Sequence, residues 1–268
     1  MTAERIDRTF AKLREQKRTA LVAFLTIGEP SVEESIACAK AALDAGADAL
    51  ELGVPFSDPT ADGPVIAAAS YRAIQRGGSF KAALRAAGAI RAVSDAPLVI
   101  FSYYNPIVAF GEEAAPRAVA NAGADALLVV DLPPEEGEAL RAAADAVNVA
   151  LIPLVAPTTG REREPRLFAR ARGFVYYVSV TGVTGTGAAP LASAGRDAAE
   201  LRQRAKLPVV VGFGVRTAED ARTVAAAGVD GVVVGTEIVR VIGNAATPEA
   251  RIDGVRQLVS RLRAGLDA

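Results

Sequence analysis

The 268-residue chain contains no histidine, no tryptophan, one cysteine (Cys38) and a single methionine, Met1. Without histidine there can be no Ser-His-Asp triad, no His-liganded zinc or iron, and no imidazole acid or base. A single cysteine excludes an internal disulfide and a Cys-based metal cluster. If the protein is an enzyme, its proton transfers must therefore be made by Asp, Glu, Tyr, Lys or water.

The charge is nearly balanced, with a formal net charge of −1 and a pI near 5.8. A nucleic-acid-binding protein normally carries a basic face, so nucleic acid is not an expected partner. Residues 1–18 are charged throughout and predict an amphipathic helix carrying Ile6, Phe10 and Leu13, not a secretory signal. Residues 173–195 carry no charge, but their Gly, Thr and Ala content favours a strand and a loop over a membrane helix. We therefore expect a cytoplasmic protein with no membrane partner.

Short apolar runs alternate with longer, Ala-rich helical patterns. Most of the runs are continuous in Val, Leu and Ile, which is typical of strands buried on both faces of a parallel sheet. The strand candidates are residues 21–26, 49–53, 98–103, 126–131, 149–154, 174–179, 209–212 and 231–235. The helical patterns between them include residues 32–45, 135–146, 192–205 and 218–227.

Eight strands with intervening helices, in a chain of this length, predict an α/β fold: a single (β/α)8 TIM barrel over residues 1–268. An extra helix would precede the first strand, and a short helix at 237–241 would follow the eighth. A doubly wound open sheet is the alternative that the pattern leaves open.

One phrase recurs where a helix joins a strand: AGADAL at 45–50, AGADAL at 122–127 and AGVDGV at 227–232. Each glycine fits a left-handed helix C-cap that leads directly into a strand. The spacing is irregular, so the phrase is one αβ turn used three times and not a solenoid repeat.

Glu51 is the most unusual residue, because it lies within an otherwise apolar strand run. Strand alternation places Leu50 and Leu52 on one face and Glu51 on the other, pointing into the barrel near the C-terminal mouth where barrel active sites lie. Desolvation there would raise the pKa of the carboxyl, which suits a general acid that later acts as a base. The alternative is a structural Glu51 paired with an arginine across the barrel.

Asp58 and Asp62 follow in the loop after the same strand. Asp-Pro and Asp-Gly-Pro are ordinary turn formers, so turn chemistry explains either aspartate taken alone. Their position directly after Glu51 also makes them candidates for substrate contact or loop control.

Glycines after the last strands predict an anion site. GFG at 212–214 follows the seventh strand, and Gly235-Thr236 follows the eighth and opens the short helical pattern. Barrels often bind phosphate with these loops and the N-terminus of a short helix, where backbone N–H groups meet the anion. The alternative is that these glycines only turn the chain.

Other chemistries have less support. The Gly, Thr and Ala composition of residues 183–190 allows a lid or an exposed tether without function. Lys206 precedes the seventh strand at the bottom of the barrel, and no lysine follows a strand, so a Schiff-base mechanism is disfavoured. No metal is expected, because only Glu51, Asp58 and Asp62 could group at the mouth.

Together these residues resemble the tryptophan synthase alpha chain family. The most specific stretch is LELGVPFSDP at 50–59 followed by ADGP at 61–64. Further matches in the family's order are FLTIGEP at 24–30, YNP at 104–106, DLP at 131–133, Ser179 with GVTG at 182–185, GFGV at 212–215 and GTEIV at 235–239. The resemblance covers nearly the whole chain.

The resemblance implies a (β/α)8 barrel that cleaves indole-3-glycerol phosphate to indole and glyceraldehyde 3-phosphate. It implies no cofactor in this chain, and a beta-chain partner that holds pyridoxal phosphate in an α2β2 complex. Glu51 matches the catalytic acid and base, and Asp62 the carboxylate that holds the indole N–H. The remaining matches are Gly185, Gly214, Gly235 and Thr236 for phosphate binding, Phe24, Tyr103, Tyr176 and Phe213 for the substrate pocket, and Asp58 and Thr184 for the two mobile loops that communicate with the partner.

Some positions depart from the family pattern. Thr236 replaces a usual Ser, Thr60 a common Leu, and residues 65–67 read VIA in place of the commoner TIQ. Thr60, residues 65–67 and the small-residue stretch TGAA at 186–189 lie in or beside the mobile loops of the family. These departures bear on coupling to the partner. Two other functions stay open: a barely active subunit that activates its partner allosterically, and a partner-free lyase or another phosphate-binding barrel enzyme.

Overall fold

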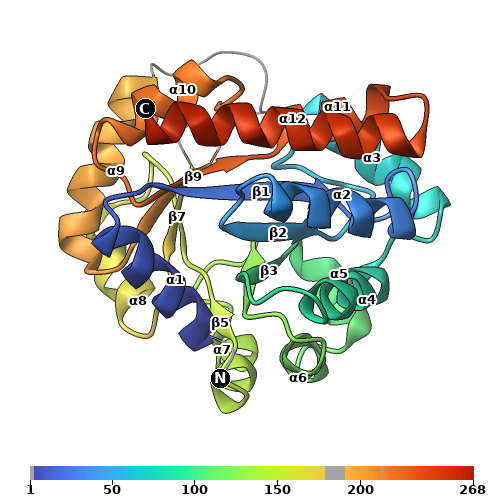
Figure 1. Ribbon diagram of the computed structural model, residues 1–268. Helices are drawn as coiled ribbons and strands as arrows, with labels where there is room; N and C mark the ends of the chain where they lie inside the picture. The colour runs from blue at the N-terminus through green and yellow to red at the C-terminus, as the bar shows by residue number, and fades with distance from the viewer. Residues whose placement is uncertain (1–2, 179–190, 213) are drawn as a thin grey trace.

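The strands form one parallel sheet that curls into a barrel with helices around it (Figure 1). The computed structural model describes residues 3–178, 191–212 and 214–268. The strand order is β5-β4-β3-β2-β1-β9-β8-β7-β6. The strands are β1 (Ala20–Thr26), β2 (Ala49–Gly53), β3 (Leu98–Ser102), β4 (Ala126–Val129), β5 (Ala150–Leu151), β6 (Leu154–Val155), β7 (Val175–Val178), β8 (Val209–Gly212) and β9 (Gly231–Val234).

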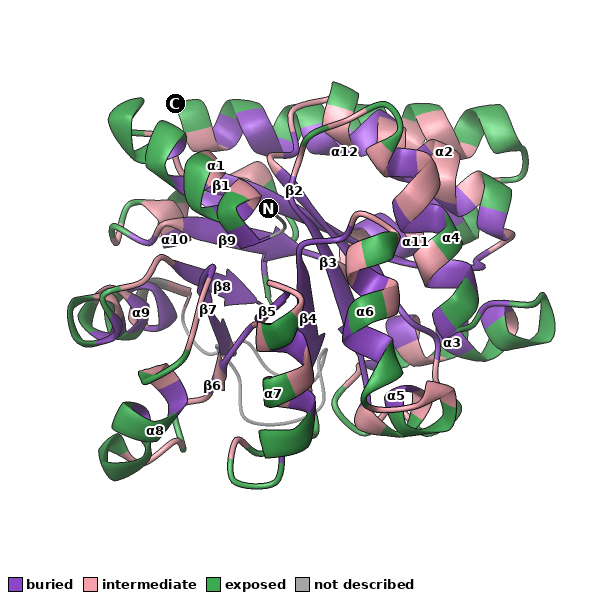
Figure 2. Ribbon diagram, turned by 90° about the horizontal axis from the view of Figure 1, so that it is seen from below, coloured by how far each residue is buried: buried purple, intermediate pink, exposed green. Residues whose placement is uncertain are grey.

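The helices cover the outside of this sheet and one end of it (Figure 2). They are α1 (Ala3–Glu15), α2 (Val32–Asp44), α3 (Pro64–Gln75), α4 (Phe80–Arg91), α5 (Tyr104–Phe110), α6 (Ala114–Asn121), α7 (Glu138–Ala146), the 3₁₀ turn η1 (Arg161–Arg163), α8 (Glu164–Phe168), α9 (Leu191–Ala205), α10 (Ala218–Ala225), α11 (Thr236–Asn244) and α12 (Pro248–Asp267).

The two outermost strands of the order, β5 and β6, are halves of one barrel strand. Only Ile152 and Pro153 separate them in the sequence. The Ile152 N–H donates to the carbonyl of Leu127 at 2.9 Å, and the Tyr176 N–H donates to the carbonyl of Pro153 at 2.9 Å, so this strand is tied to both neighbours. The predicted eight-stranded barrel is confirmed, and the open-sheet alternative is wrong.

The predicted strand 149–154 differs from the structure most. Proline has no N–H to donate to a strand ladder, and the regular pairing is interrupted at Ile152-Pro153. The predicted helix 135–146 begins only at Glu138, because residues 134–136 form a turn in which the Glu136 N–H donates to the carbonyl of Pro133. The short helix after the last strand is longer than predicted and runs over Thr236–Asn244.

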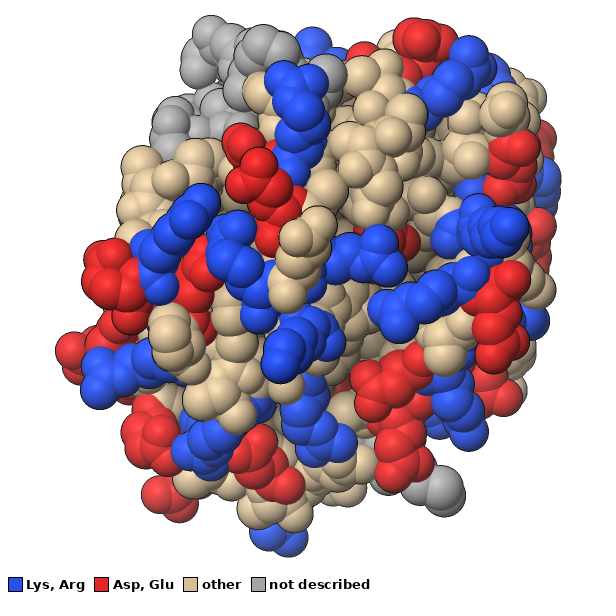
Figure 3. All heavy atoms as spheres, turned by 90° about the vertical axis from the view of Figure 1, so that its left-hand side faces the viewer, with Lys and Arg blue, Asp and Glu red and all other residues tan. Residues whose placement is uncertain are grey.

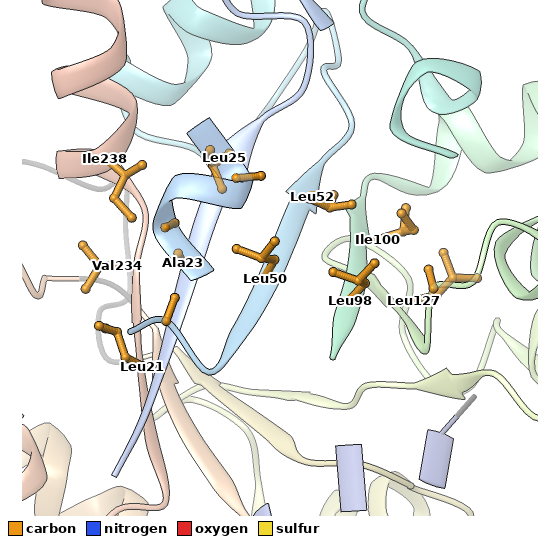
Figure 4. Close-up of a cluster of buried hydrophobic side chains, with 14 of the residues drawn as sticks. Leu21, Ala23, Leu25, Leu50, Leu52, Leu98, Ile100, Leu127, Val234 and Ile238 are labelled. Carbon is orange, nitrogen blue, oxygen red and sulfur yellow. The ribbon is translucent and has the colours of Figure 1, made fainter. Parts of the chain in front are cut away.

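Alternate residues of the strands build two separate cores. Leucines such as Leu21 and Leu25 of β1 face outward and pack with Leu50 and Leu52 of β2 beneath the helices (Figure 4). The residues between them face inward, where the barrel interior is packed by a second cluster. Ile6, Phe10 and Leu13 of α1 belong to that interior cluster, so the predicted N-terminal helix plugs the bottom of the barrel.

The recurrent Gly-x-Asp turns fasten neighbouring strands at the bottom of the barrel. Their glycines, Gly46, Gly123 and Gly228, all have positive φ angles, as a left-handed C-cap requires. Each aspartate accepts a hydrogen bond from the backbone N–H near the start of the preceding barrel strand: Leu21 to Asp48 at 2.8 Å, Leu98 to Asp125 at 2.8 Å and Val209 to Asp230 at 2.9 Å.

An arginine from a surrounding helix pairs with each of these aspartates: Arg263 with Asp48, Arg91 with Asp125 and Arg202 with Asp230. Asp125 is fully buried and is also paired with Arg5 of α1. This second ion pair ties the plug helix to the bottom rim.

The outer surface carries both signs of charge. On the face shown in Figure 3, Lys and Arg side chains are interspersed with Asp and Glu. Within the described ranges, no helix has the length and apolar character needed to cross a membrane.

Candidate active site

A cavity of about 680 Å³ opens at the end of the barrel where the strands terminate. Its walls come from β1, β2, β3, β7, β9 and the segments that follow several strands. Among the predicted site residues, those that line it are Phe24, Glu51, Asp62, Tyr176, Gly214, Gly235 and Thr236. The structure therefore brings residues that are far apart in the sequence together around one cavity.

Glu51 lies on β2 and lines the cavity inside the barrel. Its neighbours Leu50 and Leu52 face outward (Figure 4). The Glu51 side chain is fully buried, and neither carboxylate oxygen has a hydrogen-bond partner among the described residues. The arginine partner of the structural alternative is therefore not observed there. Burial raises the pKa of the Glu51 carboxyl from 4.5 to about 8, so the acid is mostly protonated at neutral pH.

Three aromatic rings surround this carboxyl. Phe24 is the direct neighbour of Glu51 in the β1–β2 register, and its ring lies edge-on to Phe101 with 5.2 Å between centroids. The Phe101 ring is in turn 6.4 Å from that of Tyr176. These rings form an apolar wall that suits a flat aromatic group. Phe101 was missed by the sequence reasoning, although the β3 alternation that turns Val99 inward also turns Phe101 inward.

Asp62 lies at the end of the loop that joins β2 to α3. The Tyr103 hydroxyl accepts a hydrogen bond from the Ala61 N–H at 3.0 Å and donates one to the Asp62 carboxylate. Burial raises the pKa of Asp62 from 3.8 to about 6, and the hydrogen bond from Tyr103 opposes that rise. Asp62 is therefore mostly ionised at neutral pH, where Glu51 is mostly protonated.

Tyr103 is buried behind this loop, and it is not among the residues that line the cavity. Its ring packs on Phe56 with 5.1 Å between centroids. Asp58 is exposed on the same loop and accepts a hydrogen bond from the Ser57 hydroxyl. Thr184, Gly185 and Phe213, which the sequence also predicts as site residues, lie outside the described residues.

The opposite end of the cavity is built from backbone at the ends of β8 and β9. Gly214 adopts a positive φ of 89°, and Gly235 caps the N-terminus of α11. A side chain at Gly235 would press on the Phe24 ring, since a Cβ there would lie 3.2 Å from a ring carbon. As in any α-helix, the first N–H groups of α11 have no carbonyl acceptor within the helix, and they lie at this end of the cavity. Such donors suit an anion.

Metal ligands do not gather in the part of the chain that the structure describes. No group of three or more His, Cys, Asp or Glu side chains is placed to hold an ion there. The cavity brings together Glu51 and Asp62, whose pKa values are separated, with an apolar wall and the N-terminus of α11.

The fold and the cavity define the class of protein: a (β/α)8-barrel enzyme with its site at the C-terminal ends of the strands. The family model described as "Tryptophan synthase alpha chain" matches residues 10–266, and the chain belongs to this family. It is a lyase of tryptophan biosynthesis that cleaves indole-3-glycerol phosphate.

Individual relatives agree over nearly the full length. The curated tryptophan synthase alpha chain of Xylella fastidiosa (strain 9a5c) is 44% identical over 266 residues, which are 98% of each chain. The crystal structure of tryptophan synthase subunit alpha from Legionella pneumophila str. Paris is 33% identical, with a TM-score of 0.90 and 98% of each chain covered. An aminoacrylate-bound tryptophan synthase from M. tuberculosis gives a TM-score of 0.87 at 32% identity, over 98% of this chain and 99% of that one.

Proposed function

We propose that Glu51 and Asp62 carry out the carbon–carbon cleavage without a metal or a Schiff base. The observation that carries this proposal is the fully buried carboxyl of Glu51 inside the cavity, which has no hydrogen-bond partner among the residues that the structure describes. An ordinary structural glutamate would be paired, because an isolated buried carboxyl is costly. Its raised pKa gives it a proton to donate at neutral pH.

In the proposed sequence, Glu51 first protonates the indole ring carbon that bears the glycerol chain. The resulting carboxylate then removes the proton from the hydroxyl on the adjacent chain carbon. The carbon–carbon bond breaks, its electron pair returns to the ring, and the hydroxyl carbon becomes the aldehyde of glyceraldehyde 3-phosphate. Glu51 is protonated again at the end, so no proton is gained or lost.

Asp62 has a different task. Protonation of the ring carbon places positive charge on the indole nitrogen, and a carboxylate that accepts the N–H hydrogen bond stabilises that charge. The pKa of about 6 keeps Asp62 ionised when Glu51 is protonated. Two carboxyls whose environments separate their pKa values can thus serve as acid and as electrostatic partner in one site.

The substrate's remaining groups would be held by the rest of the cavity. We assign the phosphate to the backbone around Gly185, Gly214, Gly235 and Thr236, and the indole ring to a pocket made by Phe24, Tyr176 and Phe213. Tyr103, which the resemblance also implies for this pocket, lies behind the Asp62 loop and supports that carboxylate. Binding energy from the remote phosphate orients the reacting carbons.

We further propose that the chain works as a single domain in the cytoplasm, bound to a tryptophan synthase beta chain in an α2β2 heterotetramer. Family membership supports the beta-chain partner. The pyridoxal phosphate would belong to that partner, which receives the indole. Asp58 and Thr184 would lie in the loops that couple the two sites.

The test is indole release from indole-3-glycerol phosphate, with and without the beta chain. Glu51→Gln removes the proton donor while keeping the shape, and we expect turnover to fall about 1,000-fold. Glu33→Gln is the matched control, since Glu33 is an exposed glutamate paired with Arg85 and should retain full activity. Full turnover of Glu51→Gln in the complex would refute the mechanism.

A further inference from the structure

The phosphate end of the cavity is lined by two arginine side chains as well as by backbone. Arg216 lies two residues after Gly214, in the segment between β8 and α10, and Arg240 lies one turn into α11. Both are cavity-lining residues, together with Thr217 and Asp220 at the start of α10. The backbone anion site is thus bordered by fixed charges.

Three of the charged groups at this end already have partners. The Arg240 guanidinium is paired with Glu237 on the same helix. The Asp220 carboxylate accepts hydrogen bonds from the backbone N–H groups of Arg216 and Thr217, both at 2.9 Å, and so caps the start of α10. These contacts serve helix structure, and the positive charge of Arg240 is already compensated by Glu237.

Arg216 is different. Its residue is exposed, and its guanidinium has no ion pair or hydrogen bond with any residue that the structure describes. The charges of Arg216, Arg240, Asp220 and Glu237 balance to zero, and without Arg216 the same end of the cavity would carry a net charge of −1. A phosphate monoester dianion would then meet a negative entrance. Arg216 therefore offsets the negative charge at this end of the cavity.

We propose that Arg216 binds the substrate phosphate from the cavity rim and adds a charged contact to the backbone site. A guanidinium presents paired N–H donors that match the geometry of phosphate oxygens. The contact is exposed, so its effect is moderate and weakens with salt. It favours phosphate monoesters over neutral or singly charged analogues. This inference rests on the phosphate placement given under the proposed function.

The experiment compares Arg216→Gln and Arg216→Lys with the wild type, each in complex with the beta chain. We expect KM for indole-3-glycerol phosphate to rise about five-fold in Arg216→Gln at low salt, with kcat unchanged, and to rise less in Arg216→Lys. The difference should shrink as KCl is raised from about 20 to about 300 mM, because salt screens exposed charges.

Arg222→Gln is the matched control. Arg222 is an exposed arginine of the adjacent helix α10, paired with Glu219 and not part of the cavity wall. Its KM should equal that of the wild type. An equal rise in Arg222→Gln would indicate a general charge effect and overturn the proposal, as would a wild-type KM in Arg216→Gln or a loss confined to kcat.

Direct binding separates this inference from the proposed function. Glycerol 3-phosphate is titrated into each variant by calorimetry, without turnover. If the cleavage mechanism were wrong but Arg216 contacts phosphate, glycerol 3-phosphate would still bind about five-fold more weakly to Arg216→Gln. Equal affinities for Arg216→Gln and the wild type would reject the Arg216 contact while leaving the cleavage mechanism in place.

Discussion

The hydroxyl of Tyr103 donates a hydrogen bond to the carboxylate of Asp62 and accepts one from the neighbouring backbone N–H of Ala61 at 3.0 Å. A residue that follows β3 therefore fixes the loop that follows β2. This contact positions the loop that carries Asp62, whereas Glu51 is positioned by the strand β2 on which it lies.

Removing that hydroxyl should loosen the loop. In Tyr103→Phe we expect the pKa of Asp62 to rise above about 6, because the hydrogen bond that lowers it is lost. We expect kcat to fall about ten-fold through poorer positioning of the carboxylate. Rate profiles against pH for both proteins would show the acid limb moving to higher pH. Tyr71→Phe, at a tyrosine that is 62% exposed, should change neither quantity. An acid limb that stays in place would contradict the role given to Tyr103.

The rate of cleavage should have a bell-shaped dependence on pH. Asp62 must be ionised to accept the indole N–H, so kcat/KM should fall as pH drops through about 6. Glu51 must be protonated to act first as an acid, so kcat/KM should fall as pH rises through about 8. Asp62→Asn should lose the acid limb and keep the alkaline one. A profile with no alkaline limb would exclude Glu51 as the initial acid.

The buried carboxyl of Glu51 should also make the stability of the free protein depend on pH. Its pKa is raised from 4.5 in the unfolded chain to about 8 in the folded one, so the folded state holds the proton more tightly. The stability from this group is complete below pH 4.5 and is lost as pH rises towards about 8, by roughly 1.4 kcal/mol per pH unit at most.

Urea unfolding of the wild type and Glu51→Gln across this range is the measurement. As pH rises, the free energy of unfolding of the wild type should fall relative to that of Glu51→Gln. The difference between the two should stop growing only once pH is above about 8. A difference that does not change with pH would mean that Glu51 has an unshifted pKa in the folded protein.

At the opposite end of the barrel, loss of Asp125 should affect stability and not catalysis. Asp125→Ala would leave Arg5, Arg91 and the Leu98 N–H without their shared partner, and we expect a loss of about 3 kcal/mol in the free energy of unfolding. Turnover per folded molecule should be unchanged. Asp95→Ala is the control, because that carboxylate lies 3.6 Å from Arg5 but is 92% exposed. Equal losses from the two variants would contradict the burial argument.

The inward direction of Glu51 could be predicted from sequence because β2 alternates regularly between apolar outward residues and inward ones. Alternation along a five-residue strand assigns each side chain to a face, and the outward leucines identify the packed side. The mouth position follows from the rule that barrel sites lie at the strand ends. Alternation therefore suffices to assign the face of a side chain inside a strand, as it does for Glu51.

The place of Tyr103 could not be derived in that way. Resemblance suggested a pocket wall, whereas the structure places the ring behind the Asp62 loop, against Phe56. Which loop a side chain contacts depends on tertiary packing between segments far apart in the sequence. Helix and strand periodicity carries no information about it. The same holds for Asp48, Asp125 and Asp230: their recurrence was visible, but their hydrogen bonds run to strands more than twenty residues earlier.

These three aspartates also suggest how the protein could be re-engineered. Each connects a backbone group to a carboxylate at the rim farthest from the cavity, and none contributes to the cavity wall. Loops at the mouth can then be replaced or grafted without disturbing the hydrogen bonds that these aspartates accept from neighbouring strands. The contacts that hold the strands together thus lie at the end of the barrel opposite the active site. A library that varies only the loops at the cavity end should retain a high proportion of folded members.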